Sequence, residues 1–104
     1  MDELSRVRNW LEAGKQVGKS WSWVESGKTY WGSVGVQKWQ GVYKIYVDKI
    51  EEARMSNLED YDTDQIIETK CFEQIQHILT ATCFINLVEL IPQKGQKIFN
   101  PELD

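Results

Sequence analysis

The sequence is poor in the residues that usually carry catalysis, metal binding or covalent cross-links. Its 104 residues include two cysteines, two prolines and one histidine. Two cysteines are too few for a disulfide framework, so we expect a reduced protein in the cytoplasm. Arginine, the usual side chain for reading bases and phosphates, does not occur between Arg8 and Arg54. Because the net charge is also −4, we expect no binding to duplex DNA.

Long apolar stretches are missing as well. The longest stretch of low charge, residues 75–91, contains His77, Asn86 and Glu89, whereas a membrane span needs about 20 mostly apolar residues. The amino-terminal residues 1–8 are charged and do not form the apolar run of a secretory signal. We therefore expect no membrane partner and no export.

The motifs that resemble enzyme or metal sites do not have the required spacing. Residues 14–20 end in Gly-Lys-Ser as a P-loop does, but Ala13 stands where the first glycine belongs. Cys71, His77 and Cys83 follow one another at steps of six residues. On a helix their side chains would point about 120° apart and could not converge on zinc. We therefore expect no catalytic residues, no metal site and no cofactor.

The first half of the chain predicts a short helix followed by a sheet. Helical spacing of apolar residues places the helix at residues 3–13. Its apolar face consists of Leu4, Val7 and Leu11. Residues 20–49 combine tryptophan, tyrosine and valine with glycine-containing turns, and we expect a three-stranded antiparallel sheet there. Its third strand alternates most clearly, with one face made of Tyr43, Ile45 and Val47.

The second half predicts a long amphipathic helix that packs on this sheet. We place this C-terminal helix at residues 63–80, where apolar residues recur at helical spacing. The stripe consists of Ile67, Cys71, Ile75, Ile78 and Leu79. The pattern of residues 83–91 fits either a strand or a further helical turn, and residues 96–99 predict a short closing strand. The expected fold class is therefore α+β, with the whole chain in one domain.

Charge is divided unevenly along the chain. Residues 1–50 hold eight basic and five acidic residues, whereas residues 51–104 hold four basic and eleven acidic residues. Between Glu51 and Glu68 there are seven acidic residues and one basic residue. Such a segment is either a solvated loop or a surface for a basic protein partner. In the second interpretation the binding residues are Glu59, Asp60, Tyr61, Asp62, Asp64 and Glu68.

All five tryptophans lie in the first half of the chain, interleaved with lysines. One interpretation is that they fill the core or face a partner, because tryptophan is a frequent interface anchor. The other is that they form an aromatic sheet face that stacks a ligand or the bases of single-stranded nucleic acid. That face would consist of Trp21, Trp23, Trp31, Trp39, Lys38 and Lys44.

The composition favours a small acidic binding protein without enzymatic activity. Its most concrete form is a bacterial immunity protein or antitoxin that blocks a basic nuclease toxin, because such inhibitors are small, acidic and free of catalytic motifs. This is a similarity of type that no family motif supports. The alternative is a ligand or single-stranded nucleic-acid binder that uses the aromatic sheet face. The sequence does not indicate an oligomeric state.

Overall fold

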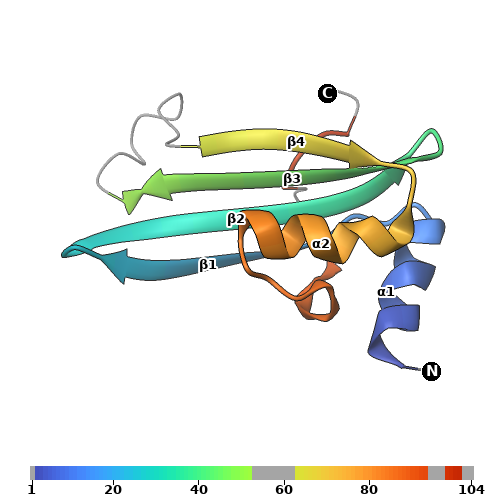
Figure 1. Ribbon diagram of the computed structural model, residues 1–104, viewed down its shortest axis with the longest axis horizontal. Coiled ribbons are helices and arrows are strands. Elements are labelled where there is room, and N and C mark those ends of the chain that lie inside the picture. Colours follow the sequence, from blue (N-terminus) through green and yellow to red (C-terminus); the bar gives the residue numbers. More distant parts are fainter. Residues whose placement is uncertain (1, 53–62, 94–97, 102–104) are drawn as a thin grey trace.

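The chain forms a five-stranded antiparallel sheet and two α-helices within residues 2–52, 63–93 and 98–101, which the computed structural model describes (Figure 1). The strand order is β4-β3-β2-β1-β5. The expected α+β class is confirmed. The elements are α1 (Glu3–Glu12), β1 (Val17–Glu25), β2 (Lys28–Trp39), β3 (Val42–Glu51), β4 (Thr63–Thr69), α2 (Phe72–Thr82), the 3₁₀-helix η2 (Leu87–Glu89) and β5 (Ile91–Pro92).

The helix predicted at residues 3–13 is present as α1, which ends one residue earlier, at Glu12. A carboxylate oxygen of Asp2 accepts a hydrogen bond of 2.7 Å from the backbone N–H of Ser5. This bond caps the helix and lowers the pKa of the Asp2 carboxyl. After the C-cap residue Ala13, Gly14 adopts a φ of 83°, a conformation that glycine reaches without steric cost.

Two tight turns connect the first three strands. Ser26 and Gly27 have φ values of 53° and 76°, and Gln40 and Gly41 have values of 52° and 82°. Two consecutive positive φ values are typical of the type I′ turn, whose twist suits antiparallel hairpins. The strands expected within residues 20–49 are therefore present. They belong to a sheet of five strands, so the three-stranded sheet was the wrong prediction.

The expected long C-terminal helix at residues 63–80 is also wrong. Its first part is the edge strand β4, which pairs antiparallel with residues 43–49 of β3. A short helix, α2, begins only after Cys71, whose backbone N–H donates a hydrogen bond of 3.2 Å to Oγ1 of Thr69. Pairing with the open edge of β3 overrides the helical spacing, and β-branched residues suit that strand. These residues are Thr63, Ile66, Ile67 and Thr69.

The chain after α2 closes the other edge of the sheet. Residues 83–91, for which the sequence left strand and helical turn open, contain the 3₁₀-helix η2. Asn86 and Glu89 form its capping box. The strand β5 follows and pairs with Val17 and Gly18 of β1. Residues 98 and 99 of the closing strand expected at 96–99 form no strand and instead pack across one face of the sheet, and residues 96 and 97 lie outside the described residues.

The two faces of the sheet are covered by different parts of the chain. α1 and α2 cover the first, which we call the helix face (Figure 1). Residues 98–101 cover the opposite face, where the Phe99 ring stacks on Tyr46 at 5.6 Å between centroids. The buried core of the helix face is Val7, Leu11, Val17, Val34, Val36, Tyr43, Ile45, Val47, Phe72, Ile75, Leu79, Leu87 and Leu90.

The helices cover only part of the helix face. We call the end of the sheet with the Ser26–Gly27 turn the distal end. α2 runs toward this end and stops before reaching it, so the strands extend beyond α2 (Figure 1). In the described part of the chain, no helix is long and apolar enough to cross a membrane.

A buried glutamine ties residues 98–101 to the sheet. The Gln16 amide nitrogen donates to the side-chain oxygen of Gln37 at 2.9 Å and to the carbonyl oxygen of Phe99 at 2.8 Å. Its amide oxygen accepts from the backbone N–H groups of Ile98 at 2.8 Å and Phe99 at 3.3 Å. Gln16 therefore supplies hydrogen bonds that a strand would otherwise provide.

We predict that Gln16→Leu lowers the free energy of unfolding by about 2–4 kcal/mol, because it leaves buried backbone groups without partners. Urea denaturation followed by circular dichroism measures this change. Gln74→Leu is the matched control, because Gln74 is exposed on α2. Equal stability of the two variants would contradict the role assigned to Gln16.

Candidate functional site

A groove of about 390 Å³ lies on the helix face, between the end of α2 and the distal parts of the strands. We call it the distal groove. β1, β3 and β4 contribute its floor and one side, and the last residue of α2 with the two residues after it forms the other side. Its lining residues are Trp21, Trp23, Glu25, Val47, Asp48, Lys49, Gln65, Thr82, Cys83 and Phe84.

The floor of the distal groove is aromatic because β2 has a glycine opposite Trp21. Gly32 pairs with Trp21 and lacks a side chain, so the indoles of Trp21 and Trp23 lie over the β2 backbone. A methyl group at position 32 would come within 2.9 Å of the Trp21 ring and 3.1 Å of the Trp23 ring. Trp23 also stacks on Tyr30, with 5.7 Å between centroids and 20° between planes.

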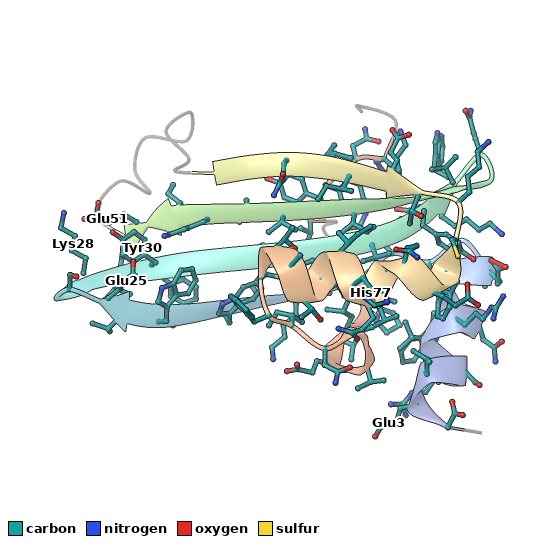
Figure 2. The ribbon with its side chains drawn as sticks, in the orientation of Figure 1. Glu3, Glu25, Lys28, Tyr30, Glu51 and His77 are labelled. Carbon is teal, nitrogen blue, oxygen red and sulfur yellow. The ribbon has the colours of Figure 1, made fainter. Side chains whose placement is uncertain are left out.

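Charged side chains surround the aromatic row at the distal end, where Figure 2 shows Glu25, Lys28, Tyr30 and Glu51 together. The Lys49 ammonium lies 4.6 Å from the centre of the Tyr30 ring and 3.9 Å from a Glu25 carboxylate oxygen. Lys28 and Glu51 approach to 4.0 Å. Such long pairs contribute little stability where their side chains are exposed, as in Lys49 and Glu25, so these two groups can exchange partners at low cost.

The helix side of the groove ends in an exposed aromatic residue. Phe84 is 87% exposed and has a φ of 59°. Its backbone N–H donates a hydrogen bond of 2.9 Å to the carbonyl oxygen of Leu79, as does that of Cys83. A left-handed residue that ends a helix in this way is usually glycine. A phenylalanine there keeps an apolar ring at the surface.

The structure divides the predicted aromatic sheet face between two sides of the sheet. Trp21 and Trp23 line the distal groove, and Lys38 lies on the same face, near α1. The Lys38 ammonium donates a hydrogen bond of 2.8 Å to Glu12. This bond raises the pKa of Lys38 and lowers that of Glu12.

The other three residues of that set belong to the opposite face. The strand register places Trp31 and Trp39 there, and Lys44 donates a hydrogen bond of 2.7 Å to the Pro101 carbonyl oxygen. Lys44 is buried, so it holds residues 98–101 in place. The exposed Trp31 donates a hydrogen bond of 3.4 Å to Glu52. The six residues therefore do not share one surface.

The predicted acidic surface lies mostly outside the described residues. This applies to Glu59, Asp60, Tyr61 and Asp62, and to the side chain of Asp64, whose backbone is part of β4. Glu68 is exposed on β4, with its carboxylate 3.8 Å from the Lys44 ammonium. Among the described residues, no three His, Cys, Asp or Glu side chains are arranged to hold a metal ion.

Several residues of this site were not assigned from the sequence, among them Gly32 and Tyr30, which contact the groove indoles, and the lining residues Lys49 and Phe84. Two of them had a usable signal, because the Ser26–Gly27 turn sets the pairing of Trp23 with Tyr30 and of Trp21 with Gly32. Placing Lys49 in the site also requires knowledge of the β2–β3 register. Phe84 had no local signal, because its role depends on where α2 ends.

We predict that Gly32→Ala displaces both groove indoles and lowers the free energy of unfolding by about 1–3 kcal/mol, because the added methyl group overpacks the floor. Near-ultraviolet circular dichroism should change with it. Ser22→Ala is the control, because Ser22 is exposed and the register places it on the opposite face. An unchanged aromatic spectrum in Gly32→Ala would show that the indoles do not lie over β2.

Comparison of the chain with protein-family models, with curated proteins and with solved structures gives no match. A proposal about function therefore rests on the distal groove and on the charges around it.

Proposed function

We propose that the protein is a non-enzymatic inhibitor that binds a basic protein partner through the distal groove. In its specific form it is an immunity protein or antitoxin that blocks the nucleic-acid cleft of a nuclease toxin. The observation that carries the proposal is the partly exposed pair Trp21 and Trp23, placed with Phe84 around a groove that α2 leaves uncovered. Clustered aromatic residues in a concave surface are typical anchors of protein interfaces.

Charge at the distal end supports a basic partner. Glu25, Glu51 and Glu52 outnumber Lys28 and Lys49 among the described residues at this end. β3 ends and β4 begins at the same end, and the sequence between them adds further acidic residues. Opposite charge on a partner accelerates association and selects against wrong partners.

A nuclease toxin suits this charge pattern because its cleft is basic to hold phosphates. An acidic surface with aromatic anchors can occupy such a cleft and exclude nucleic acid. The residues Glu59, Asp60, Tyr61 and Asp62 are proposed to contribute to this contact. Asp48, Asp64 and Glu68 are not included. The strand register places Asp48 on the opposite face, and it pairs Asp64 with Asp48 and Glu68 with Lys44.

Single-stranded nucleic acid fits the groove less well than a protein does. Stacked indoles favour bases, but phosphates need cations near the rings. Lys49 and Lys28 are paired with Glu25 and Glu51 at the distal end. The acidic neighbours would also repel a phosphate backbone. We therefore expect no salt-sensitive quenching of tryptophan fluorescence when short oligonucleotides are added at low salt.

The inhibitor proposal predicts that stoichiometric addition of the protein abolishes the activity of a nuclease encoded by the adjacent gene. Trp23→Ala should weaken inhibition about 30-fold or more, as the loss of a tryptophan anchor does. Glu25→Lys should slow association and reduce its salt dependence. Nuclease assays and stopped-flow fluorescence measure the two effects.

Matched controls separate the groove from the rest of the surface. Trp31→Ala removes an exposed tryptophan from the opposite face, and Glu3→Lys reverses an exposed charge on α1, far from the groove (Figure 2). Both should inhibit as the unmodified protein does. Absence of any inhibited nuclease would refute the proposed function. Inhibition lost equally in all four variants would refute the placement of the contact.

A further inference from the structure

We infer that the distal groove accepts an arginine side chain of the partner, and that Phe84 is kept at a conformational cost to hold it. This inference rests on the proposed function and names the chemistry of the contact. The groove offers three features that favour a flat cation: aromatic rings, a carboxylate and the carboxyl end of a helix. The rings of Trp21 and Trp23 and the carboxylate of Glu25 belong to β1, and the helix end belongs to α2.

The aromatic rings already bind a cation of this protein. The Lys49 ammonium lies 4.6 Å from the Tyr30 ring centre and 5.8 Å from the Trp23 ring centre, at the distal end of the row. This contact shows that the row attracts positive charge. Trp21 lies at the other end of the row, with 6.2 Å between its ring centroid and that of Trp23, and it lines the groove together with Thr82 of α2.

The two sides of the groove add negative potential. α2 points its carboxyl end at the groove, and its last turn contains no basic residue, so no cation of its own offsets the helix dipole there. Glu25 supplies a carboxylate whose ion pair within the described part of the chain is a 3.9 Å contact with Lys49. Gln65 adds a side-chain carbonyl that can accept a hydrogen bond.

Arginine fits these groups better than lysine does. A guanidinium is planar, so it stacks on an indole while its N–H groups donate in the ring plane. The compact ammonium of a lysine either lies over the ring or donates hydrogen bonds to the neighbouring oxygens, but does not do both. Lys49 already supplies the ammonium in this site, and a partner arginine would compete with it for Glu25.

Phe84 shows that one side of the groove is not optimised for stability. A non-glycine residue in the left-handed region costs about 1–2 kcal/mol, yet Phe84 has a φ of 59° and is 87% exposed. Its ring buries too little surface in the free protein to offset that cost. The ring gains contacts when a side chain occupies the groove that it lines.

Nuclear magnetic resonance of the full chain tests the arginine site with N-acetyl-arginine amide as the probe. Saturable shifts are expected for the indole N–H signals of Trp21 and Trp23. Trp31 and Trp39, which the register places on the opposite face, are internal controls in the same spectrum. N-acetyl-lysine amide should bind about three- to tenfold more weakly. Equal shifts of all indoles, or equal binding of the two amides, would overturn the inference.

Two charge variants should change the affinity in opposite directions. Glu25→Gln removes the carboxylate and should weaken binding of the arginine amide about threefold. Lys49→Met removes the resident cation and should strengthen binding by a similar factor. A general loss of structure would weaken both, so the opposite signs distinguish a local effect. Changes of the same sign would overturn the inference.

Variants of Phe84 separate the ring from the backbone conformation. Phe84→Gly should raise Tm by about 2–6 °C, because it relieves the left-handed conformation. Phe84→Ala should not raise Tm. Both should weaken binding of the arginine amide about threefold or more, because both remove the ring. Unchanged arginine binding in Phe84→Gly would overturn the assigned role of the ring.

The arginine site and the inhibitor function fail separately. If the nuclease is inhibited and Trp23→Ala prevents this, but the arginine amide does not bind, only the arginine site is wrong. If the amide binds at Trp21 and Trp23 but no nuclease is inhibited, the proposed function is wrong and the site remains.

Discussion

The side-chain amide of Gln16 joins residues 98–101 to the first two strands of the sheet. It lies just before β1 and bonds with Gln37 of β2 and with the backbone of Ile98 and Phe99. Because Gln16 is buried, its amide must be paired. The four hydrogen bonds place Phe99 against Gly35 and Tyr46 on the face opposite the helices. Residues 98–101 therefore cover that face without forming a further strand. The distal part of the sheet extends beyond these residues and beyond the helices.

The sequence predicted the elements that local interactions determine. The helix near residues 3–13, the glycine-containing turns within residues 20–49 and the alternation from Tyr43 to Val47 each depend on interactions within a few residues. The sequence did not predict β4, because Ile66 and Ile67 fit both a helical stripe and a strand. Only pairing with β3, which is a tertiary contact, decides between them. The same holds for Phe99, whose burial against Gly35 could not be read from residues 96–99 alone.

The candidate site was predicted in part. Trp21 and Trp23 were assigned to a sheet surface, and both line the distal groove. From the sequence they were grouped with Trp31 and Trp39. Side chains alternate between the two faces along each strand, and the pairing of β1 with β2 then places Trp21 and Trp23 on one face and Trp31 and Trp39 on the other. α2 contributes to the groove because the helix ends at Thr82. The helical spacing of apolar residues had instead predicted a helix at residues 63–80. The acidic residues 59–62 remain a prediction, since they lie outside the described residues.

The hydrogen bond between Gln16 and Phe99 joins residues that are 83 positions apart in the sequence. This sequence separation determines which parts of the chain can fold first. The two hairpins close loops of two residues, which is fast and entropically cheap. The pairing of β5 with β1 and the packing of residues 98–101 need most of the chain to be present first. During synthesis the aromatic hairpin is therefore complete well before its opposite face is covered. The serines at positions 20, 22 and 33 add polar groups to that face, which also carries Val24 and Trp31.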